Sequence, residues 1–305
     1  NTNLRDTAEH AFRLAALNMP AMQFVMYSTI LCILWFGGRL VTVGGVQTNH
    51  GRLTAAAAAK AGLACTLVLD GARPEKLSGN LLLDCLLGAS LVYTDGRSTS
   101  AVIEETLAAL QAAGRAPYFI PEGGSNAVGS AGYLAMVPEL LAQADSLPVP
   151  PARLVCTMGS LGTFAGLWLG ARAFGAPFSV TGVAVNPTTG YTREKAAALV
   201  NEMSAAYGLD IAAAPEDMDI IYADAAHDYA GPGYNVPDAK TRGAVELLAR
   251  TEGIFLDPCY TAKSFRGFCD IARELDGGAI FVHTGGTPAL WTQEHLDAFA
   301  ADYWN

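Results

Sequence analysis

The sequence predicts an α/β fold of the doubly wound type, with mostly parallel sheets covered by helices on both faces. From residue 39 onward, short apolar runs rich in β-branched residues alternate with Ala- and Leu-rich stretches of helical character. The strand-like runs are apolar at consecutive positions, which indicates strands buried on both faces. Many of these runs end in glycine, which permits a tight turn into the next helix. This alternation is typical of parallel strands joined by helical crossovers.

The expected elements follow in order along the chain. Each strand candidate is a short apolar run bounded by turn-forming residues, and helical patterns lie between the strands. The expected strands are residues 39–45, 65–71, 90–96, 116–124, 153–159, 179–186, 219–225 and 278–286. The clearest helical patterns are residues 49–62, 162–174 and 238–253. A Pro-rich loop, LPVPPARL at 147–154, separates the first four strand–helix units from the rest, so we expect two sheets.

Composition excludes several classes of protein. The chain has 305 residues, of which 51% are hydrophobic and 16% are charged, so it is not a disordered polymer. Its formal net charge is −10, and nucleic acid is therefore not expected as a partner, since phosphate binding needs a basic face. The six cysteines are dispersed through apolar runs without a C-x-x-C pair, which predicts buried, reduced thiols in a cytoplasmic protein.

One segment raises the question of a membrane. Residues 19–36 carry no charge, and their length is at the lower limit for a membrane-spanning helix. Polar residues within the segment and Pro20 at its start favour a buried helix over a span. The mixed charges before it are unlike a signal peptide. We therefore expect no membrane partner.

Ligands of open α/β folds bind where helices begin at the carboxyl ends of strands, and the turn GGVQTNHGR at 44–52 is the first candidate. Gln47, Thr48, Asn49 and His50 stand there between an apolar strand and an Ala-rich helix. A helix N-cap would explain one polar residue but not four. The pattern favours a ligand site.

The turn TMGSLGTFAG at 157–166 is the second candidate. A β-branched strand runs into a Gly/Ser/Thr turn, where backbone N–H groups and the hydroxyls of Ser160 and Thr163 can hold a phosphate. The turn lacks the lysine of a P-loop and does not fit G-x-G-x-x-G. An ordinary glycine turn explains it equally well, and a nucleotide-binding protein remains an alternative.

Three further segments complete the candidates. The loops at 227–237 and 256–264 offer Tyr234, Tyr260 and Thr261, and HTGGTPAL at 283–290 is another glycine-rich strand end. A phenol can donate or accept a hydrogen bond and can transfer a proton. The sequence does not support a serine-hydrolase site or a metal site, because the chain has no G-x-S-x-G, no H-E-x-x-H and no paired histidines with metal-ligand spacing. His10, His227 and His295 are expected to be solvated, and Tyr229 to be a packing residue.

Taken in order, these motifs resemble those of a known family. The chain is similar to the D-cysteine desulfhydrase / 1-aminocyclopropane-1-carboxylate deaminase group of pyridoxal-phosphate enzymes, which have the two-domain type II fold of the tryptophan-synthase β subunit. The resemblance runs from about residue 39 to about residue 290. It rests on GGVQTNHGRLTAAAAAKAGL, PEGGSNAVGSAGY, MGSLGTFAGL, GPGYNVP, DPCYTAKS and HTGGTPAL.

The resemblance implies a role for each matching residue. The cofactor phosphate would lie in the glycine turn, and Asn49 would hydrogen-bond the ring hydroxyl of the cofactor. Thr48 would lie beside the substrate carboxylate, with Asn49 and His50 also in the substrate site, while Tyr234 and Tyr260 would flank the substrate. The phosphate-binding residues implied are Gly159, Ser160, Leu161, Gly162 and Thr163.

The residue after Tyr260 bears on the reaction. Thr261 would face the pyridine nitrogen, where deaminases of the cyclopropane amino acid carry Glu and desulfhydrase-like members carry Thr. The resemblance therefore implies a lyase like D-cysteine desulfhydrase, which eliminates a β-leaving group to give pyruvate, ammonia and sulfide. Its partner would be a small amino-acid substrate.

The chain departs from the family at its N-terminal end. The family places the lysine that binds the cofactor in G-G-N-K-x-R-K-L-E, about 30 residues before the Q-[ST]-N-H turn, whereas this chain has no lysine before Lys60. Neither Lys60 nor Lys263 is a convincing substitute, because both have other places in the family pattern. Without that lysine the cofactor could still bind non-covalently through its phosphate, hydroxyl and ring nitrogen, but loss of the acid/base group predicts slow turnover.

Two explanations of this departure stay open. The first 38 residues are a truncated or frame-disrupted form of an active enzyme's start, or the chain is a pseudoenzyme that binds pyridoxal phosphate or an amino acid without turnover. In either case the resemblance implies a homodimer. It also implies a smaller α/β domain at 18–135 and a larger cofactor-binding domain made of 1–17 and 136–305.

Overall fold

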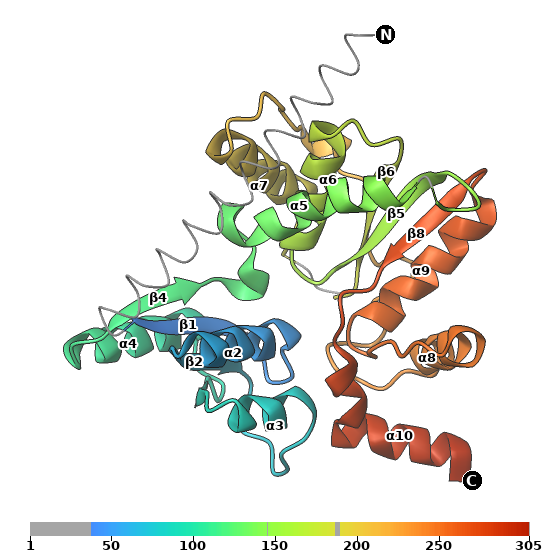
Figure 1. Cartoon of the computed structure of the whole chain (residues 1–305). Coiled ribbons are helices and arrows are strands. Elements are labelled where there is room, and N and C mark those ends of the chain that lie inside the picture. The colour runs from blue at the N-terminus through green and yellow to red at the C-terminus, as the bar shows by residue number, and fades with distance from the viewer. Residues whose placement is uncertain (1–37, 145, 187–189, 305) are drawn as a thin grey trace.

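Two parallel four-stranded sheets, each in its own lobe, form the framework of the protein (Figure 1). The computed structural model describes residues 38–144, 146–186 and 190–304. The strand order is β3-β2-β1-β4 in the first sheet and β7-β6-β5-β8 in the second. The predicted α/β fold with two parallel sheets is thus confirmed. Of the predicted loop at 147–154, residues 147–150 precede β5, whereas residues 151–154 are already part of that strand.

The first lobe comprises the strands and helices up to the end of β4. Its strands are β1 (Gly38–Gly45), β2 (Ala64–Asp70), β3 (Ser90–Tyr93) and β4 (Ala116–Ile120). Its helices are α2 (Asn49–Ala61), α3 (Gly79–Leu86) and α4 (Thr99–Ala112).

The second lobe follows the Pro-rich loop, apart from one helix that precedes it. Its strands are β5 (Pro151–Met158), β6 (Ser179–Ala184), β7 (Ile220–Ile221) and β8 (Gly278–Val282). Its helices are α5 (Ala127–Ala144), α6 (Gly162–Ala173), α7 (Arg193–Ala206), α8 (Ala239–Glu252), α9 (Thr261–Glu274) and α10 (Gln293–Trp304). Four of the eight strand candidates, β1, β2, β5 and β6, have nearly the expected extent. Strands β3, β4 and β8 begin where expected but end three or four residues early, and β7 is reduced to two residues of the expected 219–225.

Helices cover both faces of both sheets. Consecutive residues of a strand point to opposite faces, so each strand packs against helices on both sides. In β2, Leu67 and Leu69 pack with Ala55 of α2 and Leu81 of α3, whereas Val68 packs on the other face with Val102 of α4. The second sheet repeats this pattern. Leu154, Cys156 and Met158 of β5 share a core with α6 and α7, and Val155 packs with residues of α9 on the opposite face. This two-sided burial is the reason for the continuous apolar strands in the sequence.

Glycines bring α5 and α6 into close contact. A Cβ at Gly166 would collide with the backbone oxygen of Ser130, and a Cβ at Gly170 would lie 2.7 Å from a methyl carbon of Val137. Helix α5 therefore packs against α6 in the second lobe, although it directly follows the last strand of the first sheet in the chain. The expected domain boundary at 135/136 falls within this helix, and the division into domains remains a prediction.

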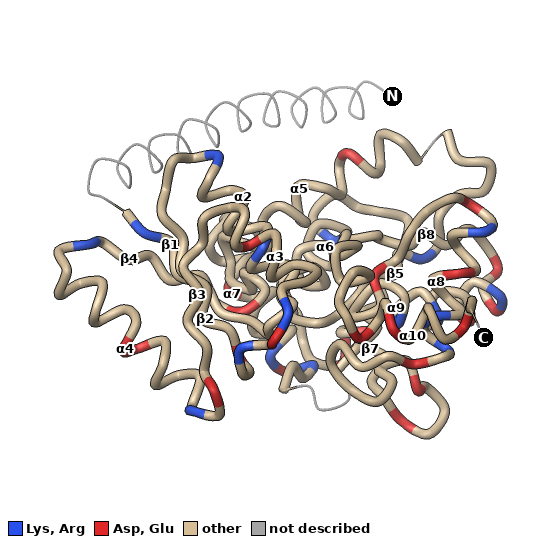
Figure 2. Tube along the Cα trace, turned by 90° about the horizontal axis from the view of Figure 1, so that it is seen from below, with Lys and Arg blue, Asp and Glu red and all other residues tan. Residues whose placement is uncertain are grey.

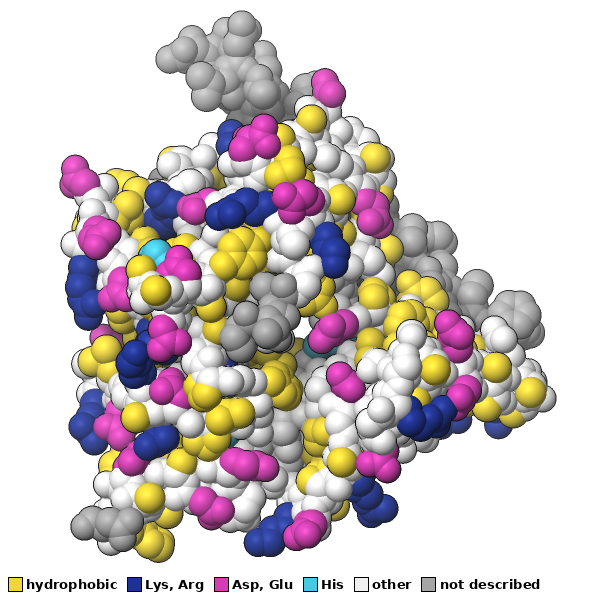
Figure 3. Space-filling view, turned by 180° about the vertical axis from the view of Figure 1, so that it is seen from behind, with side chains coloured by type: hydrophobic (Ala, Val, Ile, Leu, Met, Phe, Trp, Pro, Cys, Tyr) yellow, Lys and Arg dark blue, Asp and Glu magenta, His cyan; other side chains and the backbone are white. Residues whose placement is uncertain are grey.

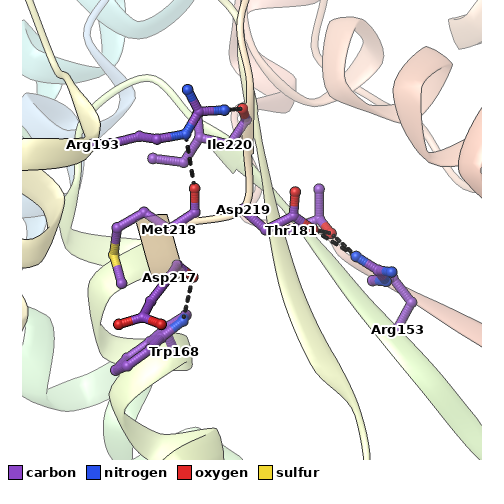
Figure 4. A network of polar contacts seen from close by, with 8 residues as sticks. All are labelled: Arg153, Trp168, Thr181, Arg193, Asp217, Met218, Asp219 and Ile220. Atoms are coloured by element: carbon purple, nitrogen blue, oxygen red, sulfur yellow. Dashed lines mark hydrogen bonds and ion pairs between the residues drawn. The ribbon is translucent and has the colours of Figure 1, made fainter. Parts of the chain in front are cut away.

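A polar network holds the edge of the second sheet in place (Figure 4). The guanidinium of Arg193 donates to the backbone oxygens of Met218 and Ile220, at 3.0 and 2.7 Å. Arg153 donates to the Asp219 carboxylate at 2.6 Å and to the Thr181 hydroxyl at 2.8 Å. These bonds fix β7 beside β6, which explains how a strand of two residues is retained at the edge.

Both sheets have a topological switch point. In the first sheet the chain moves outward through β1, β2 and β3 and then returns to pair β4 with the other side of β1. The second sheet does the same with β8 beside β5. Ligands of doubly wound folds bind outside the carboxyl ends of strands at such points. The turns at 44–52 and 157–166 follow β1 and β5, and the turn at 283–290 follows β8, so all three candidates lie at switch points.

Two expectations about single residues need correction, and a third is confirmed. His295 is not solvated but buried, with Nε2 3.1 Å from the Asn235 side-chain oxygen, because α10 packs this face inward. Cys85 is exposed rather than buried, although the five described cysteines are all free thiols. Tyr229 is a buried packing residue as expected and donates to Asp270 at 2.8 Å.

The remaining surface expectations concern charge and the membrane. Basic and acidic residues are interspersed over both lobes of the described chain (Figure 2). None of the helices within the described ranges is long and apolar enough to span a bilayer. The charge-free segment 19–36 and His10 lie outside the described residues.

Candidate functional site

Two tyrosines connect the carboxyl ends of the two sheets. A Cβ on Gly45, at the end of β1, would lie 2.7 Å from the ring of Tyr234, and a Cβ on Gly159, after β5, would lie 3.2 Å from the ring of Tyr260. The two hydroxyl groups are 3.2 Å apart, and the rings meet edge to face with centroids 5.8 Å apart. The structure therefore brings together residues that the sequence placed in four separate turns.

The first turn is built around the start of α2. Thr48 is its N-cap, and its hydroxyl accepts from the Gly51 backbone N–H at 3.1 Å. Gln47 is buried and points away from the helix, where its amide accepts from the backbone N–H of Asn80 at 2.9 Å. Gln47 therefore anchors the turn to α3, which is a structural role that the sequence pattern did not separate from ligand binding.

Asn49 and His50 are half-buried at the first two positions of α2. The Asn49 side-chain oxygen accepts from the Arg52 guanidinium. His50 Nε2 lies 3.1 Å from the Thr42 hydroxyl, which itself donates to the backbone oxygen of Ile120 at 3.0 Å. Because Thr42 uses its proton on Ile120, the His50 Nε2 carries the proton in this pair. Burial lowers the pKa of His50, so the ring is neutral near pH 7.

The glycine turn after β5 directs the start of α6 toward the same region. The Gly162 backbone N–H donates to the Ser125 hydroxyl at 2.9 Å, and the Ser160 hydroxyl packs against the backbone at Gly123. Thr163, in the first turn of α6, is half-buried. The segment 121–126 after β4 thus closes over the turn, and Ser125 is a site residue that sequence reasoning missed. Its signal was the Ser-Asn pair that follows two glycines at a strand end.

The hydroxyl protons of the tyrosine pair are tightly held. Burial is the largest cause that raises the pKa of Tyr234 and of Tyr260, and the neighbouring Asp257 contributes in the same direction. Both phenols are therefore protonated at neutral pH. They can donate hydrogen bonds or a proton to an anionic group placed between the lobes.

Asp257 organises the loop that carries Tyr260. Its carboxylate is buried and accepts from the backbone N–H groups of Cys259, Tyr260 and Thr261 at 2.8 to 2.9 Å. It also accepts from the Thr261 hydroxyl at 2.6 Å. Burial outweighs these hydrogen bonds and raises the pKa of Asp257. Sequence reasoning missed this residue, whose signal was an Asp placed four positions before Thr at a helix start.

Thr261 is fully buried, and its hydroxyl forms hydrogen bonds with both the side chain and the backbone of Asp257. It donates to the carboxylate and accepts from the Asp257 backbone N–H at 2.9 Å. The glycine-rich turn after β8 packs on the same carboxylate, because a Cβ at Gly286 would lie 2.7 Å from it. The turn at 283–290 therefore supports the site through Asp257.

A cavity of about 470 Å³ opens between the lobes beside Tyr234. Its walls come from the turn after β1, from the loop after β2 and from the start of α10, including Gln47, Lys76 and Glu294. The space-filling view shows the surface hollowed between the two lobes (Figure 3). The cavity reaches Gln47 and Tyr234 but is not lined by Thr48, Asn49 or the glycine turn at 159–163.

The two lysines considered in the sequence occupy different environments. Lys60 is exposed in the last turn of α2. Lys263 is fully buried in α9, where its ammonium donates to the Gly233 backbone oxygen at 2.8 Å and burial lowers its pKa. Lys263 thus holds the loop that carries Tyr234.

A buried carboxyl behind α2 gives a testable pH dependence. Asp84 is 0% exposed, and burial raises its pKa to about 7, while Arg52 opposes the shift. Cys65 and Tyr93 also face it. The unfolded chain releases this proton near pH 4, so the folded state loses stability as pH rises from about 4 to about 7.

We therefore expect Asp84→Asn to be more stabilising, relative to wild type, at pH 8 than at pH 5. The stabilisation increases by about 3 kcal/mol at most between pH 5 and pH 8, because only the two pH units from 5 to the folded pKa of about 7 contribute, at about 1.4 kcal/mol each. Urea unfolding of both proteins at the two pH values measures it. A difference that does not change with pH would contradict the raised pKa of Asp84.

Fold and site together define a class of protein: a doubly wound α/β protein whose ligand lies between two parallel sheets at their switch points. Comparison with known proteins makes the class specific. The family model described as "Pyridoxal-phosphate dependent enzyme" matches residues 26–285. The chain belongs to this family.

Individual relatives narrow the similarity further. A D-cysteine desulfhydrase of Klebsiella pneumoniae subsp. pneumoniae is 38% identical over 262 residues, which cover 83% of this chain and 77% of that protein. A D-cysteine desulfhydrase of Yersinia enterocolitica is 36% identical with the same coverage. Among solved structures, an ACC deaminase homologue aligns with a TM-score of 0.76 and 30% identity over 89% of this chain and 81% of that one. The resemblance stated from the motifs is confirmed.

Proposed function

We infer that this chain is a lyase that uses pyridoxal 5′-phosphate to eliminate a β-leaving group from a small amino acid, with D-cysteine as the first substrate to test. The observation that carries this proposal is the meeting of Thr48, Tyr234, Tyr260 and the glycine turn at adjacent switch points. Sequence relatives named D-cysteine desulfhydrase support the choice of reaction. The comparisons do not favour the non-catalytic alternative.

The residues present fit the cofactor. Gly162 and Ser160 lie in a cradle that a Cβ would fill, since a Cβ at Gly162 would lie 3.1 Å from the hydroxyls of both Ser125 and Ser130. The Ser130 hydroxyl is buried and has no hydrogen-bond partner among the described residues. A phosphate at the start of α6 would take the Gly162 N–H from Ser125 and be favoured by the helix dipole. The proposed phosphate ligands are the backbone and hydroxyls of Gly159, Ser160, Leu161, Gly162 and Thr163.

When bound, pyridoxal phosphate supplies an electron sink for the negative charge left at the substrate α-carbon. Asn49 would hold the ring hydroxyl, and Thr261 would lie by the ring nitrogen. The start of α2, capped by Thr48, would bind the substrate carboxylate, because free backbone N–H groups there favour an anion. Asn49 and His50 would complete this substrate site.

The tyrosines would serve the leaving group. Both hold their protons at neutral pH, as their raised pKa values require. A thiolate leaving the substrate β-carbon needs a proton, and a phenol hydrogen-bonded to a second phenol can deliver it. We assign this proton to Tyr234, because its hydroxyl accepts from that of Tyr260 and so keeps its own proton free for the leaving group. Binding of the cofactor without a covalent bond is part of the proposal, since no lysine precedes Lys60.

The product assay tests the proposal. We expect the protein with added pyridoxal phosphate to form pyruvate, ammonia and sulfide in equal amounts from D-cysteine. We expect Tyr234→Phe to lower kcat by about 100-fold, within the range for loss of a general acid. Tyr229→Phe, a buried tyrosine outside the site, is the matched control. Saturable cofactor binding with no product from D-cysteine, L-cysteine or 1-aminocyclopropane-1-carboxylate would instead establish a pseudoenzyme.

A homodimer and a cytoplasmic location remain parts of the proposal. Light scattering on the purified protein tests the first, since the homodimer has twice the mass of the 31.9 kDa chain.

A further inference from the structure

A chain of side-chain hydrogen bonds runs behind the start of α2. Arg52 lies one turn after Asn49 on the same face of the helix, and its Nη2 donates to the Asn49 side-chain oxygen. Its Nε donates to the Asn80 side-chain oxygen at 3.3 Å. The guanidinium thus joins a residue of the proposed cofactor site to α3.

Asn80 is a fixed anchor for this arginine. It is fully buried, its Nδ2 donates to the Gln47 backbone oxygen at 3.0 Å, and its backbone N–H donates to the Gln47 side chain at 2.9 Å. Gln47 in turn donates to the Ser78 backbone oxygen at 3.2 Å. Each of these groups has its donor and acceptor roles set by a backbone partner, so Asn80 can present only its oxygen to Arg52.

Arg52 decides which way the Asn49 amide faces. A guanidinium has donors only, so the amide atom bonded to it must be oxygen. The Asn49 Nδ2 is then the atom turned away from Arg52 and available to donate. With the amide reversed, Asn49 would present an acceptor to its ligand and its NH₂ to a cation.

We propose that Arg52 is a positioning residue that fixes the Asn49 amide with Nδ2 toward the ring oxygen of pyridoxal phosphate. This inference rests on the proposed cofactor site. The ring oxygen of the bound cofactor is an acceptor when ionised, and a donor amide stabilises that form, whereas an amide oxygen in the same place would repel it. Arg52 acts through Asn49 and has no contact of its own with the cofactor.

The test compares two ligands that differ only in the ring oxygen: pyridoxal 5′-phosphate and its 3-deoxy analogue. For Arg52→Met, we expect the dissociation constant for pyridoxal phosphate to rise by about 10-fold, the value of one charge-assisted hydrogen bond. The constant for the 3-deoxy analogue should change by less than about 3-fold. Asn49→Ala should show the same selective loss, and adding Arg52→Met to it should cost nothing further.

Arg115→Met is the matched control, because Arg115 is exposed and precedes β4, at the opposite end of the strands from the site. Equal losses for both ligands in Arg52→Met would mean that the arginine is only structural, and no loss for either would mean that it does not orient Asn49. Both results overturn the inference. If wild type binds neither ligand saturably, the proposed cofactor site itself fails, which is a distinct result.

Discussion

A Thr163→Asp variant is expected to bind pyridoxal phosphate about 100-fold more weakly than wild type while remaining as stable. Thr163 is half-buried in the first turn of α6, where a carboxylate interacts favourably with the helix dipole. The same carboxylate would lie beside the proposed phosphate position. Two like charges a few ångströms apart in a partly buried site repel by about 3 to 4 kcal/mol, which is at least about 100-fold in affinity.

Fluorescence titration with pyridoxal phosphate and with unphosphorylated pyridoxal measures the effect. Thr163→Asn is the control, because it has nearly the size of Asp and no charge. We expect the weak affinity for pyridoxal to be unchanged in both variants. A Thr163→Asp protein that binds pyridoxal phosphate as well as Thr163→Asn would place the phosphate elsewhere.

An Asp257→Ala variant is expected to have the largest effect on stability, a loss of about 3 to 5 kcal/mol. Three backbone N–H groups and the Thr261 hydroxyl lose their buried acceptor in this variant. Each buried donor left unsatisfied costs about 1 to 3 kcal/mol, and partial relaxation of the loop reduces the sum. The start of α9 and the position of Tyr260 depend on the same carboxylate.

Asp238→Ala is the matched control for Asp257→Ala. Asp238 also caps a helix, where it accepts from the backbone N–H groups of Lys240 and Thr241, but it is only partly buried. Its loss should cost about 1 kcal/mol, as for an ordinary N-cap. Urea unfolding compares the two. Equal losses of unfolding free energy in the two variants would contradict the claim that burial makes Asp257 the main support of the loop.

Local sequence predicted the fold well, because each strand–helix unit has its own apolar run followed by a helical pattern. The runs at 39–45 and 65–71 are continuous and apolar, and both became central strands buried on both faces. The run at 219–225 resembles them, yet only Ile220 and Ile221 pair, at the edge of the sheet where β6 is the one neighbour.

Site residues could be predicted where one turn carries several polar residues. They could not be predicted where a residue's role depends on contacts between segments distant in the chain. Thr48 and the glycine turn at 159–163 are visible in the sequence as breaks between strand and helix. The burial of Asp257 and the inward face of His295 depend on packing against segments distant in the chain. No local pattern separates these two residues from solvated ones, so their roles emerged only from the structure.

The most direct test of the central claim is a crystal structure of the full chain grown with saturating pyridoxal phosphate. We expect the phosphate on the backbone N–H groups of residues 159–163, with Gly162 released from Ser125, and the ring oxygen on Asn49 Nδ2. The same map would show whether any lysine is joined to the cofactor. A cofactor bound away from the switch points, or a turn in which Gly162 still donates to Ser125 at saturation, would contradict it.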